Sequence, residues 1–138
     1  MKSEMKVNVA AADVDLDGVT LAAPRTSNFI GCADASAVTV LYSATRDAYT
    51  DLQFEVLWYK TDQGTPDAYE SLGVVPAVSS GELVSNLYPD KYLRTTSASE
   101  DYAFTIPCKA RFMKLRVDAT AGGASDLITV DLVLIRTA

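Results

Sequence analysis

The stretch that decides the fold is DLQFEVLWYK, residues 51–60. Apolar and polar side chains alternate along it, which indicates a β-strand because successive side chains of a strand point to opposite faces. One face would carry Leu52, Phe54, Val56 and Trp58, and the other Gln53, Glu55, Leu57 and Tyr59. The first face suits a protein core and the second is mixed, as in an antiparallel sheet with one wet side.

The same alternation recurs on both sides of this stretch. AVTVLYSATR at 37–46, ARFMKLRVDA at 110–119 and LITVDLVLIR at 127–136 predict three more long strands. Shorter strands are expected at 19–22, 28–32, 72–78, 92–96 and 102–106. The glycine-containing segment 121–126 predicts that the last two long strands form a hairpin.

About eight short strands separated by turn signals predict an all-β protein, an antiparallel β-sandwich or jelly roll. A parallel sheet would require strands to alternate with helices, and the sequence shows no such alternation. A chain of 138 residues is of ordinary single-domain size, so we expect one β-sandwich domain over 18–138. Residues 1–17 are mostly polar and are expected to form an N-terminal arm or a loose strand.

The charge of the chain is acidic and uneven. The net charge is −6, from 18 acidic and 12 basic residues, which disfavours binding to nucleic acid. Residues 1–104 hold 7 bases and 15 acids, whereas 105–138 hold 5 bases and 3 acids, so the two parts carry −8 and +2. Such a split can orient the protein on a neighbour or let copies pack head to tail. The charged start, Met1 to Lys6, and the lack of a long apolar run predict synthesis in the cytoplasm and no membrane segment.

The sequence has no histidine, which excludes the Ser-His and Cys-His nucleophile pairs and the usual general base near neutral pH. We therefore expect a non-enzymatic protein without catalytic, cofactor-binding or metal residues. Acid–base chemistry would have to use carboxylates alone, and two pairs are candidates. They are Asp67 with Glu70, and Glu100 with Asp101, all in polar sequence.

Two cysteines, Cys32 and Cys108, are separated by most of the chain and belong to no CxxC pair. In a reducing compartment both are expected to be thiols. The alternative is a disulfide, which the chain-entropy account values at about 4 kcal/mol for a loop of this length.

The segment Asp13-Val14-Asp15-Leu16-Asp17-Gly18 copies the opening of a calcium loop. An EF-hand loop needs a bidentate glutamate at its twelfth position, and Pro24 stands there. A turn with alternating aspartates is the preferred interpretation, with a bound hard cation as the alternative.

Five of the seven tyrosines fall near predicted loops and strand ends, and such side chains either anchor an interface, stack on sugar rings or cap the core. They are Tyr49, Tyr69, Tyr88, Tyr92 and Tyr102. Trp58 lies on the apolar face of its strand and is expected in the core.

The C-terminal part has a familiar pattern in FTIP at 104–107, ARFMKLRV at 110–117 and ITVDL at 128–132. Together with the strand of Trp58, it resembles small β-sandwich structural proteins of tailed bacteriophages, such as head decoration or cement proteins. It also resembles galactose-binding-like jelly rolls. The first resemblance implies a virion protein made in the host cytoplasm, which stabilises the head through contacts with the major capsid protein or other virion proteins. It also implies a homo-oligomer, such as a trimer, with no nucleic-acid, membrane or cofactor partner.

The predicted contact segments are the arm and the tyrosine loops. The residues assigned to this protein interface are Val7, Val9, Val14, Leu16, Tyr69, Tyr88 and Tyr92. The alternative function is a carbohydrate-binding β-sandwich module on a fibre or in a polysaccharide-associated system.

Overall fold

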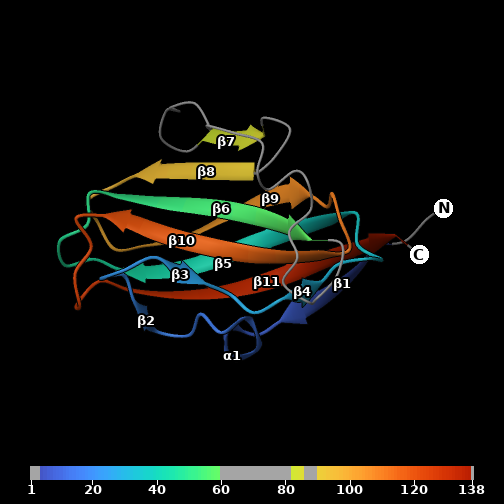
Figure 1. Ribbon diagram of the computed structural model, residues 1–138, viewed down its shortest axis with the longest axis horizontal. Helices are drawn as coiled ribbons and strands as arrows, with labels where there is room; N and C mark the ends of the chain where they lie inside the picture. The colour runs from blue at the N-terminus through green and yellow to red at the C-terminus, as the bar shows by residue number, and fades with distance from the viewer. Residues whose placement is uncertain (1–3, 60–81, 86–89, 138) are drawn as a thin grey trace.

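The computed structural model describes residues 4–59, 82–85 and 90–137, and it confirms the predicted fold class. Two antiparallel sheets pack face to face as a sandwich (Figure 1). Sheet A has the order β1-β11-β5-β9, with β2 also paired to β11, and sheet B has the order β3-β10-β6-β8-β7, with β4 also paired to β10. The elements are β1 (Glu4–Val9), α1 (Ala11–Val14), β2 (Val19–Thr20), β3 (Arg25–Thr26), β4 (Ile30–Gly31), β5 (Ala37–Thr45), β6 (Asp51–Tyr59), β7 (Glu82–Ser85), β8 (Asp90–Thr95), β9 (Glu100–Pro107), β10 (Phe112–Thr120) and β11 (Leu127–Thr137).

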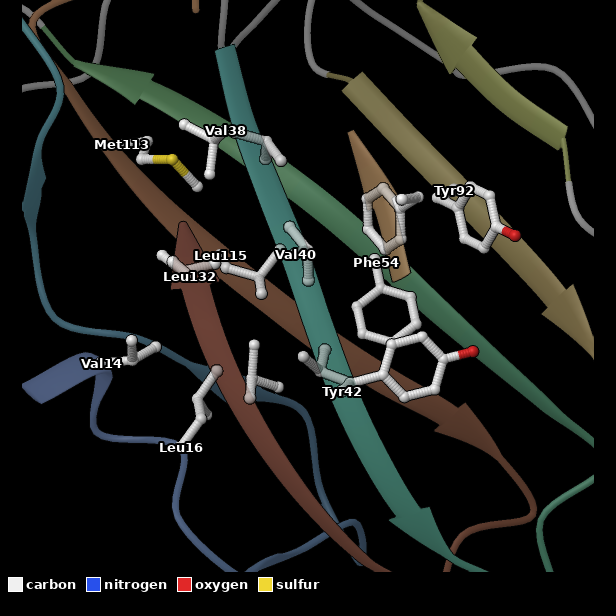
Figure 2. Packing of buried hydrophobic residues seen from close by; sticks show 14 of the residues in the cluster. Val14, Leu16, Val38, Val40, Tyr42, Phe54, Tyr92, Met113, Leu115 and Leu132 are labelled. Atoms are coloured by element: carbon white, nitrogen blue, oxygen red, sulfur yellow. The ribbon is translucent and has the colours of Figure 1, made fainter. Parts of the chain in front are cut away.

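The core lies between the sheets and is built from the alternating apolar residues of the long strands. On sheet B, Trp58 of β6 is paired with Met113 of β10, and both side chains are fully buried. Sheet A contributes Val38 and Val40 from β5, and their side chains meet those of sheet B in the cluster drawn in Figure 2. Burial of a large apolar side chain contributes about 1.5–3 kcal/mol, so these strands hold the sandwich together.

The predicted hairpin of the last two strands is wrong. β10 pairs with β6 in sheet B, whereas β11 pairs with β5 in sheet A, so the connection at 121–126 crosses from one sheet to the other. Each strand has one apolar face, and placing the strands in opposite sheets lets both faces point into the same core. The alternation in the sequence defines which face each strand buries, but it does not define which other strand lies beside it in a sheet.

The predicted arm forms the edge of sheet A. β1 runs antiparallel along β11 from the pair Glu4–Thr137 to the pair Val9–Leu132. The single turn of α1 follows, and its residue Val14 is fully buried, as is Leu16 after it. After α1 the carbonyl of Leu16 accepts a hydrogen bond from the N–H of Val130 in β11, and β2 then pairs with β11. Residues 4–20 therefore belong to the sandwich.

Asp126 fixes the crossing connection. Its carboxylate is completely buried and accepts hydrogen bonds from the backbone N–H groups of Asp47, Ala48, Tyr49 and Gly123. Burial alone would raise the pKa of Asp126, but the four N–H donors outweigh it and hold the pKa below its usual value. This carboxylate ties the β5–β6 connection to the β10–β11 connection at one end of the sandwich.

Candidate functional site

The outer face of sheet A carries a shallow hollow over β11, β5 and β9. Leu41 of β5 lies between Asp131 of β11 and Ala103 of β9 in the strand register. In the next row Ser43 lies between Thr129 and Asp101. The hollow has a volume of about 390 Å³, and its lining residues are Leu41, Tyr42, Ser43, Asp101, Tyr102, Ala103, Thr129 and Asp131.

Two of these lining residues are large, apolar and exposed, but only Leu41 lies on the outer face, because Tyr102 is paired with Tyr42 and shares the inner face with Phe104. Leu41 and Tyr102 are each 38% exposed, and among the described residues only Met5 is a more exposed large hydrophobic residue. The outward position of Leu41 follows from the alternation of β5, whose burial pattern points Val40 and Tyr42 inward. An apolar side chain on the water side of an ordered strand is a candidate contact residue.

Tyr102 is held by an aromatic cluster at the edge of the sandwich. Its ring centroid lies 6.2 Å from that of Tyr42 and 6.2 Å from that of Tyr92. The guanidinium of Arg94 lies over the Tyr102 ring, 4.6 Å from the centroid, and supplies a cation–π contact. Tyr92 in turn stacks on Phe104 at 4.3 Å. The cluster joins β8 of sheet B to β9 of sheet A.

A polar network completes this edge. The Tyr42 hydroxyl donates to Glu100 Oε1 at 2.7 Å, and Arg94 donates two hydrogen bonds to Glu100 Oε2 at 3.1 and 3.2 Å. Figure 2 shows the hydroxyl groups of Tyr42 and Tyr92 pointing to the same side, away from the aliphatic core. Burial, and then the hydrogen bond to Glu100, raises the pKa of Tyr42, and burial raises that of Tyr92 as well. Both phenols therefore stay neutral at physiological pH.

The hollow is locally acidic. Asp101 and Asp131 are exposed at its two sides, and none of its described lining residues is basic. Asp131 has a second contact, because its Oδ1 accepts the backbone N–H of Ala11 at 2.7 Å. Asp101 points away from its neighbour Glu100, which faces Arg94, so these two carboxylates do not act together. The other predicted pair, Asp67 and Glu70, lies outside the described residues.

Most of the predicted interface residues are not at this surface. Val14 and Leu16 are fully buried and Tyr92 is 4% exposed, so these three side chains fill the chain's own core and leave no surface for a partner. Val7 and Val9 are half-buried and pack against the core from β1. Tyr69 and Tyr88 lie outside the described residues.

The sequence prediction missed Leu41 and Asp131 and named Asp101 only as an acid–base candidate paired with Glu100, although a signal for Leu41 was present. Leu41 falls on the face of 37–46 that also holds Thr39 and Ser43, and an apolar residue in a polar row marks a contact position. The two aspartates carry no such mark, because acidic residues are common on any outward face.

The aspartate repeat at 13–18 forms a turn. α1 ends at Val14, its C-cap residue Asp15 has a positive φ of 66°, and Gly18 has a φ of 60°. Within the described ranges no group of three or more Cys, Asp or Glu side chains is arranged to hold a metal ion. A helix with the length and apolar character needed to span a membrane is also absent from those ranges.

Comparisons with known proteins give little beyond this geometry. No protein-family model and no curated protein matches the sequence. Among solved structures, the chain is similar to a protein of Bacillus endospore appendages, described as a novel family of disulfide-linked pili, with 10% identity and a TM-score of 0.42 over 99% of this chain and 87% of that one. It is also similar to a carbohydrate-binding module, CBM4, with 14% identity and a TM-score of 0.42 over 96% of this chain and 71% of that one. At these values neither likeness carries an argument about function.

Proposed function

We propose that this protein is a non-enzymatic structural component that assembles with copies of itself through the outer face of sheet A. The observation that carries the proposal is the exposure of Leu41 on the outer face of sheet A, in the hollow between Asp101 and Asp131. An exposed aliphatic side chain of this kind contributes to a protein interface once a partner excludes water from it. Leu41 lies on a strand that is paired on both sides, so little conformational entropy is lost when a partner binds.

Charge complementarity supports a second copy as the partner. The centre of the outer face of sheet B holds Lys91, Lys114 and Arg116 around the single carboxylate of Glu55. Lys91 and Arg116 both lie near Glu55 Oε2, at 3.7 and 3.6 Å. Two aspartates occur on the same face, toward the ends of the strands. The cationic centre of sheet B therefore complements the acidic hollow of sheet A.

A contact between two different faces is heterologous. Such contacts generate rings when the rotation between copies closes and filaments when it does not. The interface would bury the apolar anchors and leave the charged groups to set register and to steer association. Because those charges lie at the surface, added salt should weaken the assembly.

The setting that we propose is a virion. It rests on the resemblance of the C-terminal strands to head decoration and cement proteins, and it makes the major capsid protein a further neighbour. Co-sedimentation of the purified protein with phage heads that lack their decoration protein tests this part. Failure to bind such heads would remove the virion setting and leave self-assembly as proposed.

The experiment that tests self-assembly compares two matched variants by light scattering over a range of concentrations. Leu41→Asp places a charge in the acidic hollow, and Met5→Asp makes the same kind of change at an exposed residue of β1 outside the hollow. We expect Leu41→Asp to weaken association at least about tenfold and Met5→Asp to leave it unchanged. A wild-type protein that stays monomeric at all concentrations would contradict the proposal.

Carbohydrate binding is the second candidate, favoured by the carboxylates of Asp101 and Asp131 and the hydroxyls of Ser43 and Thr129 in the hollow. Carboxylates and hydroxyls accept hydrogen bonds from sugars. The ring of Tyr102 lies on the inner face of sheet A beside Tyr42, with Arg94 over it, so it does not stack on a sugar in the hollow and a protein partner is the better fit. Binding to a glycan array that is lost in Asp101→Asn, with the solution mass unchanged, would favour this candidate.

A further inference from the structure

Cys32 and Cys108 meet at one end of the sandwich although they are far apart in the sequence. Cys32 follows β4 and Cys108 follows β9. The backbone N–H of Cys32 donates to the carbonyl of Arg111 at 2.8 Å, and that of Cys108 donates to the carbonyl of Ser36 at 3.0 Å. The loop before β5 and the loop before β10 are therefore cross-bonded at both cysteines. Relative movement of the two sulfur atoms is restricted on both sides.

The two thiols are in contact, and neither is in a disulfide. The single hydrogen of the Cys32 thiol can donate to the carbonyl of Ala110, at 3.3 Å, or turn to the sulfur of Cys108. Cys32 is 1% exposed, whereas Cys108 is half-buried and open to solvent on one side. A reagent can thus reach Cys108 first.

The contact also divides the roles of the two sulfurs. The hydrogen bond between them, together with burial, raises the pKa of Cys32 well above its ordinary value. The same hydrogen bond lowers the pKa of Cys108 in spite of its partial burial. The thiolate is the nucleophile in thiol–disulfide exchange, so the accessible cysteine is also the more reactive one.

We propose that Cys32 and Cys108 form a redox modification site that closes to an intramolecular disulfide when it meets a small-molecule disulfide. The Cys108 thiolate attacks the small disulfide, forms a mixed disulfide and releases one small thiolate. Cys32 then loses its proton to solvent, attacks the Cys108 sulfur and releases the second small thiolate. The protein loses two electrons and two protons, and one small disulfide becomes two small thiols.

The consequence is a covalent closure across the sandwich. The segment between the two cysteines contains β5 through β9, so the bond would restrict a large part of the unfolded chain. A disulfide that closes a loop of this size raises the melting temperature of a domain of this length by roughly 10–15 °C. The reduced protein would suit the cell interior, and the oxidised protein a particle that has left it.

The test incubates the folded protein with oxidised glutathione and then measures its intact mass, its thiol content after denaturation and its melting temperature. We expect both thiols to disappear, the mass to fall by that of two hydrogen atoms and the melting temperature to rise. Unchanged thiols, two bound glutathiones or disulfide-linked dimers would each overturn the proposal.

Two variants separate the steps. In Cys32→Ala the mixed disulfide at Cys108 cannot resolve, so one glutathione should stay attached. In Cys108→Ser the buried Cys32 should stay unmodified while the protein is folded. Rapid modification of Cys32 in folded Cys108→Ser would contradict the assigned order of attack. The wild-type measurement decides the proposal if either variant fails to fold.

Discussion

Replacing Asp126 by asparagine isolates the buried carboxylate that joins two chain connections. Three of its four backbone donors, the N–H groups of Asp47, Ala48 and Tyr49, point at Oδ1, and that of Gly123 points at Oδ2. Asparagine can keep an oxygen at the first position but must place its amide group opposite the N–H of Gly123. One hydrogen bond is then lost, two donors face each other and the remaining acceptor has no charge.

Hydrogen bonds to charged groups contribute about 1.5–3 kcal/mol each, and they do not add fully. We therefore expect Asp126→Asn to lower the free energy of unfolding by about 2–3 kcal/mol at neutral pH. This corresponds to a melting temperature lower by roughly 6–10 °C. Thermal and urea unfolding followed by circular dichroism measure it, with Asp17→Asn at an exposed aspartate as the matched control.

The pH dependence gives a second test of the same reasoning. The folded pKa of Asp126 lies below its unfolded value of about 3.9, so its contribution is complete above that pH and is lost as pH falls through the folded pKa. Wild type should therefore lose stability in acid faster than Asp126→Asn, and the two curves should converge. Equal stability at neutral pH, or a gap that stays constant into acid, would refute this account of the carboxylate.

Two other substitutions probe the packing. Gly122→Ala would place a Cβ against the backbone carbonyl oxygen of Leu21, so the β10–β11 connection must shift. We expect the free energy of unfolding to fall by about 2–4 kcal/mol in urea unfolding, and an unchanged midpoint would contradict that close approach. Tyr42→Phe removes the hydroxyl that donates to Glu100 and should cost about 1–2 kcal/mol without altering the fold, as measured by thermal unfolding; a stabilised variant would show that this hydrogen bond contributes nothing.

Much of the sandwich could be predicted from the sequence because alternation reports directly which side chains are buried. The long strands β5, β6, β10 and β11 lie where alternation predicts them. The two-residue alternation does not show which strands pair with each other. For this reason β10 and β11, which are consecutive in the sequence, were expected to form a hairpin. The segment 13–17 did carry a signal for burial, since Val14 and Leu16 alternate with three aspartates, but its likeness to a calcium loop obscured it.

The candidate site was less accessible to sequence reasoning. Leu41, Asp101 and Asp131 come from three strands and meet only through the register of sheet A. The contact between Cys32 and Cys108 likewise depends on two loops that the fold brings together. Asp126 is one acidic residue in a polar turn, and its four donors come from elements that the sequence does not show to be adjacent.

The central claim is that the acidic hollow of sheet A binds the cationic centre of sheet B on another copy, and a charge exchange tests it most directly. Asp101→Lys and Lys114→Glu should each abolish self-association, because each brings like charges together at the contact. The double variant restores opposite charges, and light scattering should show that it assembles again at low salt. Single variants that assemble like wild type, or a double variant no more associated than either single one, would contradict the claim.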